Sequence, residues 1–151
     1  MGTWDTGPFD NDSAADWCGA LHDADPALRP ELVRHALTVT AETTGYLDDH
    51  EACAAVAAAA IVASTLPGGT PITSHYAPAF LAEGGTIAFS EDFAPLAVRA
   101  LTRVVGENSE WFDLWTEDGA DSPDEAFAAI ADLRKVLLPA TVDKDQQALP
   151  L

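Results

Sequence analysis

Positive charge is scarce in this chain. Lysine and arginine together number 7 against 25 aspartates and glutamates, which gives a formal net charge of −18 at pH 7. Such a chain repels phosphate backbones and anionic lipid headgroups, so binding to nucleic acid or to a membrane is disfavoured. A strong negative field can attract a basic protein or metal cations instead, but the favoured interpretation of the charge is an acidic surface that serves solubility.

Cysteine is equally scarce. Cys18 and Cys53 are the two cysteines, and neither belongs to a C-x-x-C motif. We expect both to be buried small side chains and not a disulfide or a catalytic thiol. The chain also lacks an apolar run long enough to cross a bilayer, and its start lacks the basic and apolar segments of a signal peptide. These absences predict a cytoplasmic protein.

Motifs that carry known chemistry are missing. There is no P-loop, G-x-G-x-x-G, G-x-S-x-G or H-E-x-x-H sequence, and the four histidines do not show H-x-x-x-H spacing. His75 stands in an uncharged stretch beside Tyr76, where a structural role is favoured over that of a general base. The sequence therefore predicts no catalytic residue, no metal site and no cofactor, and an enzyme is the weaker class.

Helical periodicity, by contrast, is found along most of the chain. It predicts one all-α domain over residues 1–138, a bundle of about six helices, followed by a C-terminal tail over 139–151. The second helix is expected over 30–44, with Gly45 as its stop and an inner face of four residues. These four are Leu32, Ala36, Val39 and Thr43. The tail is expected to be frayed or to lie on the surface.

An alanine-rich segment over 48–66 is expected to be the central helix. Asp48 as N-cap and Glu51 three residues later resemble a capping box, and no charged residue follows until Glu83. A helix that is small and apolar on every side is usually buried. Three later helices are indicated. The first lies within residues 90–106, with Ser90 as a plausible cap, and the second lies within residues 108–119 and is capped by Ser109. The third begins at the cap Ser122.

The opening stretch TWDTGPFDNDSAADW raises the question of a metal loop. Asp10 and Asp12 alternate as calcium ligands do, but alanines stand where a third ligand and a glycine are needed, and Leu21 stands where a glutamate is needed. Helix initiation explains the stretch better, with Asn11 or Asp12 as the cap and Asp16 near the positive end of the helix dipole. The candidate binding residues in this stretch are Trp4, Asp10, Asp12 and Asp16.

A second candidate surface is the acidic run from Glu107 to Glu125. It holds eight aspartates and glutamates, no lysine or arginine, and two tryptophans, Trp111 and Trp115. Two interpretations stand open. The favoured one is a solvated acidic face with tryptophans in the core; the other is an acidic and aromatic patch for a basic partner.

Two motifs of the chain resemble those of a known family. The first, at the start of the chain, runs through Gly2, Trp4, Gly7, Phe9, Asn11, Asp12, Ala14 (or Ala15) and Asp16. The second is the segment NSEWFDLWTEDG, through Ser109, Glu110, Leu114, Trp115 and Glu117. On these residues the chain resembles the DUF4259 family, a bacterial domain of unknown function. Asp5 departs from the glycine that the family often has, which puts the geometry of that turn in doubt. The resemblance implies a small helical bacterial protein and carries over no activity.

Two functional hypotheses follow from these features. The first is a non-enzymatic interaction or regulatory protein that binds a basic protein, as an immunity-type inhibitor or an adaptor does. The second is a small metal-dependent enzyme or hydrolase built on Asp10, Asp12, Asp16 and His75. The first is favoured because the charge is extreme and catalytic motifs are absent.

Overall fold

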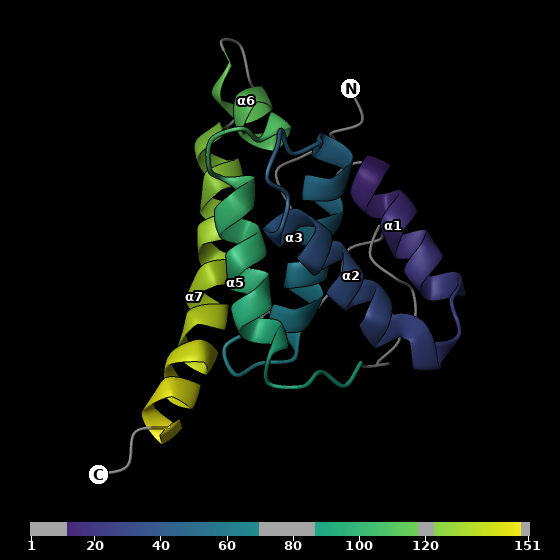
Figure 1. Cartoon of the computed structure of the whole chain (residues 1–151), viewed down its shortest axis with the longest axis vertical. Helices are drawn as coiled ribbons and strands as arrows, with labels where there is room; N and C mark the ends of the chain where they lie inside the picture. Colours follow the sequence, from purple (N-terminus) through teal and green to yellow (C-terminus); the bar gives the residue numbers. More distant parts are fainter. Residues whose placement is uncertain (1–11, 70–86, 118–122, 149–151) are drawn as a thin grey trace.

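The computed structural model describes residues 12–69, 87–117 and 123–148, with the backbone alone at 123 and over 140–148. This part of the chain folds into α-helices and one short 3-10 helix (Figure 1). They are α1 (Asp12–Asp23), η1 (Pro26–Leu28), α2 (Arg29–Ala41), α3 (Asp49–Ser64), α5 (Phe93–Val104), α6 (Glu110–Thr116) and α7 (Pro123–Ala148). Within the described ranges there is an isolated β-bridge between Leu47 and Ser109 and no strand, so the predicted all-α fold is confirmed.

The alanine-rich helix α3 is the centre of the bundle, as its sequence predicts. It contacts α1, α2, α5, α6 and α7, and Figure 1 shows α5 and α7 along one side of it and α1 on the other. Eleven of its residues are buried, including every residue from Ala55 to Ala63. The small alanine side chains allow neighbouring helices to approach from all sides, because no bulky group holds them apart.

Helix α2 presents a different face to the core from the one its sequence indicates. Its buried residues are Val33, Ala36, Leu37 and Thr40. Of the four predicted residues Ala36 alone is buried, and the other three are half-buried. Two overlapping apolar stripes exist on this helix, and its packing against both α3 and α5 selects the second. Thr40 is satisfied there, since its hydroxyl donates to the Glu51 carbonyl oxygen at 3.1 Å.

The end of α2 also differs from the prediction. The helix ends at Ala41 with Glu42 as its C-cap, and Gly45 is not its stop. The segment after it is held by Arg103 of α5, which donates to the carbonyl oxygens of Thr43 at 3.0 Å and Gly45 at 2.5 Å. The same guanidinium donates to the carbonyls of Glu107 and Asn108, at 3.0 and 3.2 Å. One side chain thus joins the loop before α3 to the loop before α6.

Two of the predicted helix caps are confirmed, one is wrong, and the predicted cap Ser122 lies outside the described residues. Asp48 caps α3, accepting from the His50 amide at 2.9 Å, and Ser109 caps α6, accepting from the Phe112 amide at 3.4 Å. At α5 the N-cap residue is Asp92 and not Ser90. Ser90 bonds to the Asp92 side chain instead, with its hydroxyl donating to Oδ1.

Helix α7 continues further than its sequence indicates. Its buried stripe includes Ala126, Ile130 and Leu137, but the helix runs through Pro139 to Ala148. A proline removes one backbone hydrogen bond without ending a helix that is otherwise continuous. Residues 139–148 are therefore helical and not frayed, while the domain boundary at 138 stays a prediction. In the described ranges, no helix has the length and apolar character needed to cross a membrane.

Candidate functional site

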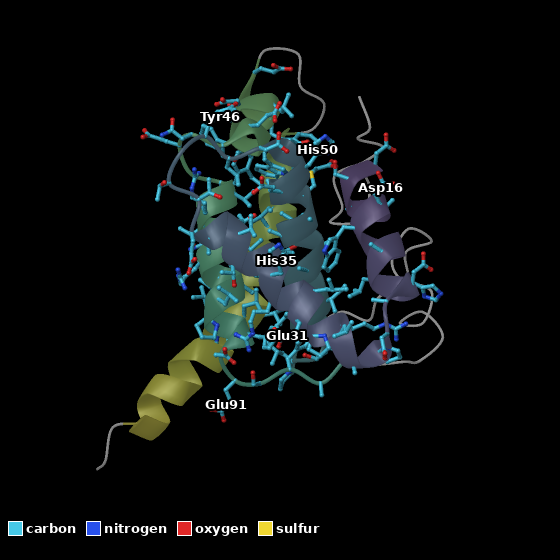
Figure 2. The ribbon with its side chains drawn as sticks, turned by 45° about the vertical axis from the view of Figure 1, so that its right-hand side comes forward. Asp16, Glu31, His35, Tyr46, His50 and Glu91 are labelled. Carbon is cyan, nitrogen blue, oxygen red and sulfur yellow. The ribbon has the colours of Figure 1, made fainter. Side chains whose placement is uncertain are left out.

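A hollow of about 480 Å³ lies between α1, α2 and α3, and we call it the α1 groove. Three residues of each helix line it: Ser13, Asp16 and Trp17 from α1, His35, Ala36 and Val39 from α2, and His50, Glu51 and Ala54 from α3. In the view of Figure 2, Asp16 and His50 appear near the upper ends of α1 and α3, and His35 lies lower, on α2. The volume is within the range of ligand sites, about 300–1,000 Å³.

The α1 groove has a polar rim and an apolar floor. Asp16, His35, His50 and Glu51 are exposed at the rim, whereas the apolar side chains that complete the lining are half-buried or buried. The two carboxylates come from opposite helices, Asp16 from α1 and Glu51 from α3. No lysine or arginine is among the nine lining residues. The chemistry of the groove therefore suits an amphipathic cation.

A hydrogen bond closes one end of the groove, between Ser13 Oγ and His50 Nδ1 at 2.5 Å. Both residues stand second in their helices, after Asp12 and Asp49. Helices α1 and α3 are in contact and begin at the same end of the molecule, so their second residues meet (Figure 1). A serine hydroxyl beside an imidazole nitrogen is the first requirement of a nucleophile and its base. Within the described residues, no carboxylate is hydrogen-bonded to the His50 ring.

The structure brings two of the predicted N-terminal site residues to this region. Asp16 lines the α1 groove, and Asp12 is the exposed first residue of α1. Trp4, Asp10 and His75 lie outside the described residues, as does the alternative cap Asn11. In the described ranges, no three histidine, cysteine, aspartate or glutamate side chains are grouped as a metal site would require.

The second candidate surface divides into a core part and a surface part. Trp111 is 6% exposed and packs against Phe127 of α7, with ring centroids 5.2 Å apart and nearly perpendicular planes. Trp115 is half-buried beside Trp111, 6.0 Å between centroids. Trp111 is thus placed to hold α6 on α7, which favours the structural interpretation for this residue.

The acids that begin this run take part in the junction between α3 and α6. The Glu110 carboxylate accepts from the Asp49 amide at 2.9 Å, at the positive end of the α3 dipole. The Asp113 carboxylate accepts from the Tyr46 hydroxyl at 2.7 Å, and this bond raises the pKa of Tyr46 to about 12. Burial raises the pKa of Asp49. The two hydrogen bonds give Glu110 and Asp113 a structural role in addition to their charge.

Both cysteines are buried and free, as predicted. Burial raises the pKa of Cys18 to about 12 and also raises that of Cys53, whose thiol donates to Asp49 Oδ1 at 3.6 Å. A thiol is nucleophilic as its thiolate, so neither cysteine is suited to catalysis.

Most of the groove residues are not identified by sequence reasoning. The sequence places His50 and Glu51 at the start of α3 without assigning them to a site. It does not single out His35 or Trp17 as candidate site residues. No local motif joins them, since Ser13 and His50 are 37 positions apart. A signal does exist on α1: Ser13, Asp16 and Trp17 have helical spacing beside the core stripe of Ala14, Cys18 and Leu21.

The fold is an all-α bundle around a small-residue central helix, and the candidate site is a groove with an acidic rim against that helix. The chain belongs to the family described as "Domain of unknown function (DUF4259)", whose model matches residues 2–134. The resemblance seen in the sequence motifs is thereby confirmed. No curated protein and no solved structure matches the chain.

Proposed function

We propose that this chain is an acidic interaction protein that binds a basic segment of a partner protein in the α1 groove. The observation that carries the proposal is the lining of the groove, which has one carboxylate from α1, one from α3, the indole of Trp17 and no lysine or arginine. The net charge of −18 draws a basic partner toward the molecule from any direction. The groove supplies what net charge cannot, namely one place where a cationic side chain can dock.

The chemistry of the groove supports this assignment in two parts. Asp16 and Glu51 provide negative charge at an exposed rim, where they raise the association rate with a basic partner and make the affinity depend on salt concentration. The half-buried Trp17 and Val39, with the buried Ala36, provide apolar surface for the stem of a long cationic side chain. An immunity-type inhibitor or a regulatory adaptor would use such a site to cover a basic surface of its target.

The test is an NMR titration of the isotope-labelled chain with an amidated oligolysine peptide, followed at low and at high salt. We expect chemical-shift changes that concentrate on α1, α2 and α3 around the groove and that decline as salt is added. The double variant Asp16→Asn, Glu51→Gln should bind about tenfold more weakly, which is about 1.4 kcal/mol.

The matched control is Glu31→Gln with Glu91→Gln. These two exposed acids lie near the lower part of the view in Figure 2, away from Asp16, and their removal changes the net charge by the same amount. If the control weakens binding as much as the groove variant does, the peptide responds to net charge alone and the groove is not the site.

A second candidate function is a small hydrolase at the same end of α1, and the Ser13–His50 hydrogen bond favours it. In this mechanism Ser13 Oγ forms a bond to an ester carbonyl carbon while its proton passes to His50 Nδ1. The carbon–oxygen bond to the alcohol breaks, and the alcohol leaves with that proton. Water then attacks the acyl-serine, and the acid is released.

A fluorophosphonate probe tests this candidate directly. A hydrolase of this kind would be labelled at Ser13, as shown by mass spectrometry, and the label would be lost in His50→Gln. Absence of a Ser13 adduct in the folded protein rejects the serine mechanism. A metal-dependent enzyme built on Asp10, Asp12, Asp16 and His75 is tested by calorimetric titration with divalent cations, where the absence of heat rejects it.

A further inference from the structure

The proposed function leaves open which cation the α1 groove prefers, and the arrangement of its side chains distinguishes arginine from lysine. A preference for arginine at this groove rests on the proposed function. We infer that the groove is an arginine site, in which the guanidinium of a partner's arginine lies against the Trp17 indole and its edges pair with the carboxylates of Asp16 and Glu51.

The first element of this inference is the position of Trp17. Its side chain is half-buried, so part of the indole is covered by the bundle while another part lines the groove. Burial on one side holds the ring in place, so it loses little freedom when a ligand binds. Tryptophan is the best aromatic partner for a cation, and arginine is found over its face more often than lysine.

The second element is the placement of the two acids. Asp16 stands one residue before Trp17 on α1, and Glu51 lines the same groove from α3. A guanidinium is planar and carries five N–H donors around its edge, so it can stack its face on a ring while its edge donates to carboxylates on two sides. A lysine ammonium has neither a flat face nor a fixed fork, and it gains less from the same groove.

The third element is the polarity of the remaining rim. The imidazoles of His35 and His50 add two more ring systems, and the hydroxyl of Ser13 already bonds to one of them. The rim thus offers aromatic rings and two carboxylates to one occupant. Flat aromatic surface next to acids is the complement of a guanidinium and a poor match for an anion.

The experiment compares two amidated peptides that differ at a single position, with arginine in one and lysine in the other, by calorimetry and NMR. We expect the arginine peptide to bind about threefold to tenfold more tightly, with nuclear Overhauser contacts between its side chain and the Trp17 indole. In Trp17→Leu the preference should vanish while weaker binding of both peptides persists. Phe89→Leu, which removes a half-buried aromatic ring outside the groove lining, should leave the preference unchanged.

The outcomes separate this inference from the function on which it depends. Equal affinity for the two peptides, still sensitive to Asp16→Asn with Glu51→Gln, overturns the arginine site and leaves the basic-partner function standing. Failure of both peptides to perturb the groove overturns both proposals. If Trp17→Leu does not fold, the test relies on nuclear Overhauser contacts between the peptide's arginine and the Trp17 indole in the unmodified protein. The absence of these contacts at saturation contradicts the stacking arrangement.

Discussion

Ser13 Oγ lies 2.5 Å from Nδ1 of His50, so a hydroxyl in the first turn of α1 is joined to an imidazole in the first turn of α3. Helix α1 packs against α3, and its buried residues are the apolar Ala14, Cys18 and Leu21. The Ser13–His50 hydrogen bond therefore joins α1 to α3 at the start of both helices, next to the apolar contact between them. Both residues line the α1 groove.

The substitution Ser13→Ala should loosen this end of α1. We expect a loss of about 0.5–1 kcal/mol in the free energy of unfolding, since one exposed hydrogen bond is removed, and faster amide exchange in the first turns of α1. Urea denaturation and hydrogen exchange measure the two effects. Ser64→Ala is the control, because its hydroxyl donates to the Ile61 carbonyl of the same helix. Equal behaviour of the two variants would mean that the Ser13–His50 bond does not fasten α1.

Arg103 should be the most sensitive surface position of the bundle. Its guanidinium donates to four carbonyl oxygens in two loops, and Arg103→Met leaves these without their charged donor. We expect a cost of about 2–3 kcal/mol in urea denaturation. Arg103→Lys should recover less than half of it, because an ammonium lacks the fork geometry. Arg99→Met, at an exposed position one turn earlier on α5, should cost less than about 0.5 kcal/mol.

The contact between Arg34 and Asp92 predicts a pH dependence of stability. Hydrogen bonds from the Arg34 guanidinium, and then from Ser90, hold the pKa of Asp92 well below its usual range. A carboxylate with a depressed pKa in the folded state stabilises the fold above its unfolded pKa, about 3.9, and loses this contribution as the pH falls toward the folded pKa.

The corresponding test compares the unmodified chain with Asp92→Asn at neutral pH and below pH 4. The difference in the free energy of unfolding should be below about 1 kcal/mol at neutral pH, since the pair is exposed, and should shrink in acid. Glu91→Gln, at the exposed neighbouring position, should not reproduce this trend. A difference that grows as the pH falls would contradict the assigned role of Asp92.

How far the sequence predicts this molecule depends on the range of the interactions involved. The caps Asp48 and Ser109 act within a few residues, and both were predicted. The inner face of α2 depends on two neighbouring helices, and its prediction was wrong at three of four positions. The α1 groove depends on three helices whose relative placement no local pattern encodes. His50 could be assigned to a helix start, but its contact with Ser13 arises from the packing of α1 on α3.

The two cysteines should be unreactive in the folded protein. Cys18 is 1% exposed and Cys53 is 5% exposed, and burial raises the pKa of both thiols, so the thiolate fraction at pH 8 is very small. A chromogenic disulfide reagent should react with neither in native buffer and with both in denaturant. Ala20→Cys, on the exposed face of α1, supplies a reactive control. Rapid native reaction of either natural thiol would show that the core opens locally.

The small residues of α3 should resist enlargement more than alanines elsewhere. Ala57 is fully buried in the helix that contacts α1, α2, α5, α6 and α7. In Ala57→Leu the added methylenes must displace a neighbouring helix, and we expect a cost of about 1–3 kcal/mol in urea denaturation. Ala128→Leu is the control, since residue 128 is exposed on α7 and leucine is nearly as good a helix former as alanine. A tolerated leucine at 57 together with a costly one at 128 would mean that close approach to α3 does not hold the bundle together.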